Sequence, residues 1–279
     1  MSEIRNIGSR LEIDGAGYFV SPCNTANITK PWQDVVDGAI AAYRYFLKDK
    51  LVAVYVRGSI VRGTAVAGVS DVDTFAVVSG SRWQLELNWI EQTQRRLADK
   101  CDFDTSVEMQ VMTREELSEP ANLESLGFTV KVLSACVWGE DVSTELPPFG
   151  LGNYLLKDLH ELQTSMASVS QALASKPSES EVYLICQWLM KVLVRAGYCL
   201  VMPYERAFTR DLYPCFEGFC RHYPAKAELM SQALQLAIYP CSDKERILNL
   251  QQCLGTWLLA QANACPPNLE QGTCHQQQA

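Results

Sequence analysis

Val56-Arg57-Gly58-Ser59-Ile60-Val61-Arg62-Gly63, followed by Ser70-Asp71-Val72-Asp73, is the stretch that decides the fold of this chain. It predicts a strand, a tight Gly-Ser turn, a short helix, a loop and a second strand that opens with two aspartates. Because side chains alternate between the faces of a strand, Asp71 and Asp73 should point to the same side. Paired carboxylates suit Mg²⁺, and backbone N–H groups where a turn enters a helix can hold a phosphate. The stretch therefore indicates chemistry on a nucleoside triphosphate.

The composition narrows the class of protein. The chain has 279 residues, of which 48% are hydrophobic and 20% charged, and these values allow one large domain or two ordinary ones. A net charge of −8 argues against a general nucleic-acid binder, which needs a basic surface to neutralise phosphates. No apolar run reaches the ~18 residues of a membrane span. The start, Met1-Ser2-Glu3-Ile4-Arg5, has no signal-peptide pattern. We therefore expect no membrane or nucleic-acid partner.

The eleven cysteines are odd in number, scattered and free of any Cys-x-x-Cys pair. Several lie in apolar stretches, namely Cys136, Cys186, Cys199 and Cys253. They lack the spacing of a disulfide framework or a zinc site. The pattern predicts buried, reduced thiols in a cytoplasmic protein.

The N-terminal half alternates strands with helices, which predicts a sheet covered by helices. A hairpin at residues 10–20 precedes a helix that has Pro31 in its first turn and ends near Lys48. Three central strands and one helix are expected next, at residues 51–57, 71–78 and 106–112 for the strands and 83–100 for the helix. A capping box at residues 113–116 opens a short helix that ends by Pro120. Periodicity leaves residues 123–138 open between helix and strand.

The C-terminal half is helical after Pro147-Pro148-Phe149-Gly150. One helix is expected at residues 151–174, a second after the cap Ser178 at 179–201, and shorter ones at Pro214 and Pro224. A capping box at residues 242–245 opens the last helix. The fold class is therefore α/β (α+β), with a mixed-sheet domain at residues 1–148, a four- or five-helix bundle at 149–264 and a mobile tail at 265–279.

The pattern Gly58-Ser59, eleven intervening residues and Asp71-Val72-Asp73 resembles the signature of the nucleotidyltransferase superfamily that includes DNA polymerase beta. The local form, Gly-Ser-x-x-x-Gly followed by Ser-Asp-x-Asp, is most similar to bacterial aminoglycoside and lincosamide nucleotidyltransferases. The resemblance implies a third carboxylate on a neighbouring strand, for which Glu108 fits and Asp104 is the alternative. Trp138-Gly139-Glu140-Asp141 resembles the segment that closes the catalytic domain of those enzymes.

The resemblance also implies roles for these residues. Asp71, Asp73 and Glu108 would hold Mg²⁺, with Glu108 either a metal ligand or the base that accepts the proton of an attacking hydroxyl. Gly58 and Ser59 would hold the terminal phosphates. These roles match the physical chemistry of phosphoryl-type transfer, in which the protein mainly positions the groups and neutralises charge.

Further phosphate-binding candidates are Arg62 and Ser70 near the motif and Lys191 and Arg210 in the helical half. Arg57 is an alternative source of positive charge to Arg62. Lys191 and Arg195 lie four apart on one helix face, which suits either triphosphate binding or a solvated basic face. Thr209-Arg210 could bind phosphate or could simply cap a helix.

The expected reaction transfers a nucleoside monophosphate, taken as AMP from ATP, to a hydroxyl group of a small molecule in a cleft between the domains. The family supplies the triphosphate class, whereas the nucleobase, the acceptor and the oligomeric state stay open. Three alternatives remain: an adenylyltransferase that modifies a protein, as an antitoxin would modify its toxin; a non-catalytic nucleotide sensor; and a nucleic-acid polymerase relative, which the acidic composition disfavours.

Overall fold

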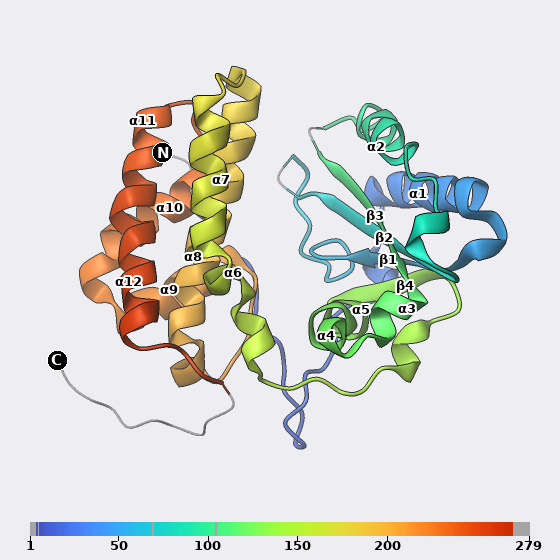
Figure 1. Cartoon of the computed structure of the whole chain (residues 1–279), viewed down its shortest axis with the longest axis horizontal. Coiled ribbons are helices and arrows are strands. Elements are labelled where there is room, and N and C mark those ends of the chain that lie inside the picture. Colours follow the sequence, from blue (N-terminus) through green and yellow to red (C-terminus); the bar gives the residue numbers. More distant parts are fainter. Residues whose placement is uncertain (1–3, 5, 69, 104, 270–279) are drawn as a thin grey trace. The chain divides into compact units, whose positions relative to one another are not determined.

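The computed structural model describes residues 4, 6–68, 70–103 and 105–269 (Figure 1). The chain divides into two compact units. Residues 12–150 form the sheet unit. Among the described residues, 151–269 form the helical unit together with residue 4 and residues 6–11, whereas the sequence predicts these N-terminal residues in the first domain.

The sheet unit is built on four strands in the order β3-β2-β1-β4. Their bounds are Leu51–Arg57 for β1, Val72–Val78 for β2, Val107–Thr113 for β3 and Ser134–Gly139 for β4. β1 is antiparallel to both β2 and β4, whereas β3 is parallel to β2, so the sheet is mixed, as the sequence predicts. β3 was expected to be central but lies at the edge, with β2 as its partner.

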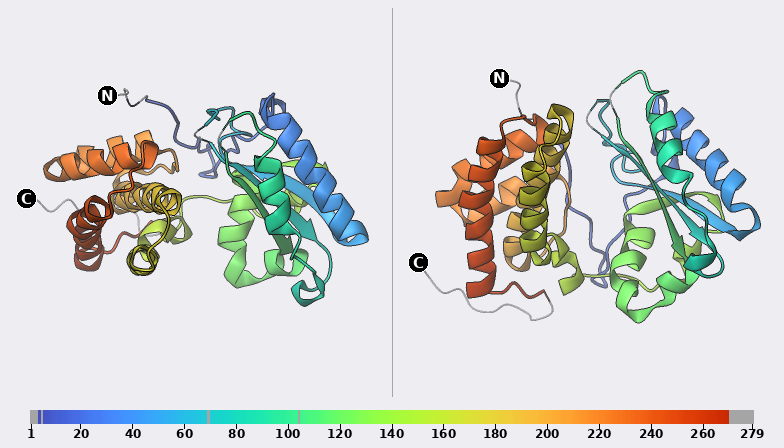
Figure 2. Two further views of the ribbon diagram at one scale, coloured as in Figure 1. Left: turned by 90° about the horizontal axis from the view of Figure 1, so that it is seen from above. Right: turned by 45° about the horizontal axis from the view of Figure 1, so that its top comes forward.

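Both faces of this sheet are buried, which explains the nearly continuous apolar sequences of β1 and β2. Val54 and Val56 pack on one face in a cluster with residues of α1 (Trp32–Leu47) and α2 (Ile90–Ala98). Ala53 and Tyr55 pack on the other face in a cluster with residues of α3 (Arg114–Ser118) and α5 (Phe128–Val132). The short α4 (Pro120–Asn122) lies between α3 and α5 in sequence. Figure 2 shows the two helical layers around the sheet.

Several predictions for the sheet unit need correction. The short helix expected after Gly58 is absent from the described residues 58–63, which form consecutive turns between Gly58 and Gly63. Both glycines have positive φ, 84° and 71°, a conformation that interrupts a helix. The helix expected from residue 83 begins only at Ile90, because Leu85 is extended. The ambiguous segment 123–138 contains both a helix, α5, and a strand, β4.

The helical unit is built around one long, largely buried helix, α8 (Glu179–Glu205), which contacts α6, α7, α9, α10 and α12. The other helices are α6 (Lys157–His160), α7 (Leu162–Ala174), α9 (Leu212–His222), α10 (Ala227–Ile238), α11 (Lys244–Leu250) and α12 (Thr256–Ala264). The predicted cap at Ser178 is present as a full capping box with Glu181. By length and composition α8 could cross a membrane, but 67% of its most apolar window is buried, as in the core helix of a bundle.

Two predictions for the helical unit are wrong. Residues 151–174 do not form one helix, because a 3₁₀ turn at Asn153–Leu156 and the short α6 precede α7. The helix that begins after the predicted capping box is α11, and it is capped by Asp243, whose carboxylate accepts a hydrogen bond from the Arg246 N–H at 3.0 Å. Ser242 instead donates to Glu179 at 3.1 Å. The predicted mobile tail lies outside the described residues from 270 onward, and Leu269 is buried.

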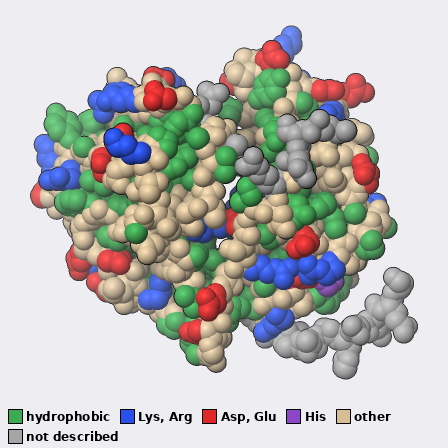
Figure 3. Space-filling view, turned by 180° about the vertical axis from the view of Figure 1, so that it is seen from behind, with side chains coloured by type: hydrophobic (Ala, Val, Ile, Leu, Met, Phe, Trp, Pro, Cys, Tyr) green, Lys and Arg blue, Asp and Glu red, His purple; other side chains and the backbone are tan. Residues whose placement is uncertain are grey.

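The N-terminal segment is attached to the helical unit by hydrogen bonds and charge. The Leu11 N–H donates to the Phe208 carbonyl at 2.8 Å, and the Thr209 hydroxyl donates to the Ser9 carbonyl at 2.8 Å. Arg10 pairs with Glu205, whose side chain is 5% exposed. Glu205 also contacts Arg221 and His222. Figure 3 shows basic side chains beside a histidine on the reverse side of this unit.

The cysteines in the described part of the chain form no disulfide. Cys186, Cys199 and Cys215 are buried. Burial raises the pKa of the Cys215 thiol to about 12, so this thiol stays protonated at neutral pH. The expectation of burial is wrong for Cys253, which is exposed, and Cys136 is only half-buried.

Candidate active site

One row of side chains crosses the sheet where β1 ends. The antiparallel register places Arg57 opposite Asp73, and the parallel register places Glu108 opposite Asp73 on the other side. Ser134 of β4 lies opposite Arg57 and completes the row. Residues directly paired across strands project from the same face of a sheet. The strand register therefore brings Asp73 and Glu108 together with Arg57.

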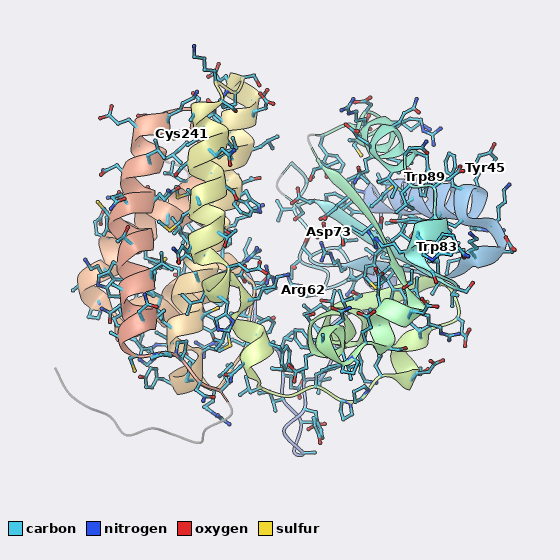
Figure 4. All side chains as sticks on the ribbon, in the orientation of Figure 1. Tyr45, Arg62, Asp73, Trp83, Trp89 and Cys241 are labelled. Atoms are coloured by element: carbon cyan, nitrogen blue, oxygen red, sulfur yellow. The ribbon has the colours of Figure 1, made fainter. Side chains whose placement is uncertain are left out.

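The three charged side chains contact one another. Arg57 Nη2 lies 3.1 Å from Glu108 Oε2, and Arg57 Nε lies 3.9 Å from Asp73 Oδ2. Asp73 and Glu108 also share a hydrogen bond. All three are partly exposed, with 28% to 42% of each side chain accessible to solvent. Figure 4 labels Asp73 and Arg62 in the sheet unit. A ligand can therefore reach these groups without unfolding of the sheet.

The electrostatics of the pair favour one proton between the two carboxyl groups. Burial raises the pKa of Asp73 to about 7, Arg57 opposes this shift, and the hydrogen bond and charge of Glu108 add to it. Burial also acts to raise the pKa of Glu108, but the hydrogen bond from Asp73 and the charge of Arg57 lower it overall. Two adjacent carboxylates repel each other, and a cation between them relieves that repulsion.

Asp71 lies just before β2 rather than in the strand. The prediction that Asp71 and Asp73 share one strand face therefore does not fix the position of the Asp71 side chain. The Ser106 hydroxyl donates to Asp71 Oδ1 at 2.7 Å. The charge of Asp71 nevertheless contributes to raising the pKa of Asp73. Asp104, the alternative to Glu108, lies outside the described residues.

Ser70 closes the loop that leads into β2. Its N–H donates to the Val66 carbonyl at 2.9 Å, and its hydroxyl accepts a hydrogen bond from the Val66 N–H at 3.0 Å. The Thr105 hydroxyl donates to the Ser70 carbonyl at 3.0 Å. Ser70 thus ties the loop to the segment before β3.

The Gly-Ser turn passes directly beside Asp73. A Cβ atom on Gly58 would lie 3.3 Å from Asp73 Oδ2, and Gly58 has a φ of +84°, so both space and backbone conformation favour glycine. The Ser59 carbonyl accepts a hydrogen bond from the Thr64 N–H at 2.9 Å. Arg62 turns back on this segment and donates from Nε to the Gly58 carbonyl at 3.3 Å. The structure therefore places Gly58 beside Asp73, with Ser59 and Arg62 in the same turn.

The remaining phosphate-binding candidates belong to the helical unit. Lys191 lies in the middle of α8. Arg210 pairs with Asp158 at 3.0 Å, and its carbonyl accepts a hydrogen bond from Arg195 Nε at 3.2 Å. Burial and the charge of Arg210 lower the pKa of Arg195 to about 10. Thr209 is buried and accepts a hydrogen bond from the Asp211 N–H at 3.1 Å. The N-cap of α9 is Asp211, and its side chain makes no capping hydrogen bond, so the alternative that Thr209-Arg210 caps this helix is wrong.

Arg57 is the residue whose position sequence reasoning missed, because it was considered only as an alternative to Arg62. The sequence did indicate that the two strands pair, since two apolar runs of equal length joined by a turn can form an antiparallel pair. Without the register, however, nothing in the sequence places Arg57 opposite Asp73 rather than opposite a neighbouring residue.

The chemistry of the donor set fits Mg²⁺ in part. Asp73 and Glu108 offer adjacent hard oxygen ligands, and a divalent cation would displace the proton that they share. Within residues 4, 6–68, 70–103 and 105–269, no group of three or more His, Cys, Asp or Glu side chains is arranged to hold a metal ion. The two-carboxylate pair is thus the part of the predicted set that the fold assembles.

Residues 42–131 match the family model described as the nucleotidyltransferase domain. This chain carries a nucleotidyltransferase domain. The matched segment includes β1, β2 and β3 and therefore Gly58, Asp73 and Glu108. Lys191 and Arg210 lie outside the nucleotidyltransferase domain.

A comparison with solved structures supports the same fold. The chain is similar to a crystal structure of spectinomycin adenyltransferase AAD(9) from Enterococcus faecialis with ATP and spectinomycin, with a TM-score of 0.58 and 15% sequence identity. The similarity covers 81% of this chain and 98% of that one. At this identity the likeness shows that the fold of the nucleotidyltransferase domain and much of the rest of the chain is shared. No curated protein matches the chain.

Proposed function

We propose that this chain transfers AMP from ATP to a hydroxyl group of a small-molecule acceptor in a reaction that depends on Mg²⁺. The observation that carries the proposal is the Asp73–Glu108 pair beside the Gly58 turn, inside the segment that matches a nucleotidyltransferase domain. The acceptor oxygen forms a bond to the α-phosphorus, and the bond from that phosphorus to the bridging oxygen breaks. Pyrophosphate leaves with the electron pair.

Each residue of the site has a proposed task. Asp73 and Glu108 would hold Mg²⁺, with Asp71 as a further ligand. The bound ion would neutralise phosphate charge and orient the triphosphate. Glu108 is alternatively the base that takes the proton of the acceptor hydroxyl. These assignments use the same oxygens that Arg57 contacts.

The turn beside the carboxylates suits the phosphates. Gly58 lets the backbone approach closely, and the Ser59 hydroxyl is the proposed donor to a terminal phosphate. Arg62 can add positive charge next to the same turn. Ser70 would act indirectly by fixing the loop before Asp71. Lys191 and Arg210 remain proposed triphosphate ligands from the helical unit.

Two observations support a small hydroxylated acceptor. The similar solved structure is that of a spectinomycin adenyltransferase that contains ATP and spectinomycin. The net charge of −8 suits a cationic acceptor better than a polyanion. The proposed class is therefore an amino-substituted, hydroxylated small molecule.

Pyrophosphate release tests the proposal. The purified protein is mixed with ATP, Mg²⁺ and a panel of hydroxylated acceptors that includes aminocyclitols and aminoglycosides, with Asp73→Asn as the inactive control. We expect acceptor-dependent pyrophosphate and an acceptor heavier by one AMP group, both lost in the variant. Nucleotide binding without turnover across the panel would contradict transfer and favour a sensor, whereas label that moves onto a protein would favour a protein-modifying enzyme.

A further inference from the structure

Arg57 contacts the same carboxylate oxygens that a cation would use. Its two contacts, to Glu108 Oε2 at 3.1 Å and to Asp73 Oδ2 at 3.9 Å, join the two adjacent carboxylates through one guanidinium. The planar guanidinium suits such a two-sided contact, because its N–H donors point in fixed directions. A positive charge therefore already contacts both ligands assigned to Mg²⁺.

This position is imposed by the backbone rather than by side-chain rotation alone. Arg57 is the last residue of β1 and is paired with Asp73 in the antiparallel register. Val56, its neighbour in β1, is completely buried on the apolar face that packs against α1. A register shift would bury the charge of Arg57 in that apolar cluster. The backbone of Arg57 therefore stays opposite that of Asp73 whatever ligand binds, and only the guanidinium group can withdraw.

We propose that Arg57 competes with the divalent cation for Asp73 and Glu108, and so sets the cation concentration at which the site fills. The inference rests on the proposed function, because it takes these two carboxylates as the metal ligands. Arg57 is a positioning residue here: it keeps the carboxylates together and yields their oxygens to the cation.

The ion pairs that Arg57 makes with Asp73 and Glu108 are weak enough for a divalent cation to replace them. The side chains are 28% to 42% exposed, and ion pairs at such exposure are weak because water and salt screen them. A purely structural ion pair would stabilise the fold without changing the affinity of the site for a cation. If Arg57 competes with the cation, removing its charge makes the cation bind more tightly.

Binding of Mn²⁺ alone, followed by electron paramagnetic resonance, tests the proposal on the full chain. The variants are Arg57→Gln, which removes the competing charge, and Arg57→Lys, which keeps a charge. Arg114→Gln is the matched control, because Arg114 also joins two carboxylates, Glu140 and Glu145, in the same unit. Asp73→Asn reports whether the ion binds at this site at all.

We expect Arg57→Gln to bind Mn²⁺ about tenfold more tightly than the wild type, the gain for two screened ion pairs. Arg57→Lys should fall between these two proteins, and Arg114→Gln should match the wild type. Equal Mn²⁺ affinity of Arg57→Gln and Arg114→Gln would overturn the competition while leaving the metal site intact. Mn²⁺ binding that Asp73→Asn does not weaken would remove the metal site and the inference together.

Discussion

Gly58→Ala probes the closest contact between the motif turn and the carboxylates. Gly58 has a φ of +84°, a region that costs an L-residue about 1–2 kcal/mol. The new Cβ would also lie 3.3 Å from Asp73 Oδ2, so that the carboxylate or the turn must move by a few tenths of an ångström. Alanine restricts the unfolded chain and returns about 0.4–1 kcal/mol. We therefore expect a net loss of about 1 kcal/mol in the free energy of unfolding.

The activity loss should exceed what the stability loss explains. A displaced Asp73 changes the position of a proposed metal ligand, and small misplacements of reacting groups can cost up to about 10²-fold in rate. We expect pyrophosphate release to fall by at least about tenfold, measured under conditions where the variant is fully folded. Urea unfolding gives the stability and the coupled pyrophosphate assay gives the rate.

Gly17→Ala is the matched control in the same unit. Gly17 has a φ of +89° with nothing within 4 Å of its Cβ position, so alanine there meets the same backbone strain without touching the site. Both variants should lose similar stability, whereas only Gly58→Ala should lose activity. Wild-type stability of Gly58→Ala, or equal rates for the two variants, would refute the reasoning.

Three further predictions concern the carboxylates of the candidate site and Glu205 in the helical unit. Asp73→Asn should abolish pyrophosphate release yet unfold no more easily at pH 8 in urea, because burial raises the pKa of Asp73 to about 7 and its ionised form opposes folding there. Glu108→Gln should lower the rate by about 10²-fold or more if Glu108 is the base, and an unchanged rate would exclude that role. Burial acts to raise the pKa of Glu205, but hydrogen bonds from His222 and Arg221 lower it overall. Glu205→Gln should therefore cost about 2 kcal/mol at pH 7, and urea titrations should show this difference shrinking as the pH falls below about 4.5; a constant difference would contradict the shift.

Much of the fold could be predicted from local patterns. The apolar run 51–57 became β1 with the predicted bounds, and the capping boxes at Thr113 and Ser178 opened helices where expected. These features depend on neighbouring residues alone. The break near residue 161 and the late start of α2 depend on tertiary packing and on local turns, which periodicity does not report.

The candidate site shows the same division between local and distant information. The motif identified Gly58, Ser59 and Asp73 as candidate site residues, because it depends only on their spacing along the chain. The position of Glu108 opposite Asp73 rested on a resemblance, and the register shows that this residue is in place. The position of Arg57 beside Asp73 could not be predicted, because it depends on the register between β1 and β2, which the sequence does not specify.

A crystal structure of the protein with Mg²⁺ and a non-hydrolysable ATP analogue would show whether Asp73 and Glu108 hold the metal ion. We expect a metal ion about 2.0–2.1 Å from carboxylate oxygens of Asp73 and Glu108, with the triphosphate against the Gly58-Ser59 turn and Arg57 withdrawn from the shared oxygens. A metal ion and triphosphate bound elsewhere on the chain, with Arg57 still joining both carboxylates, would contradict this expectation.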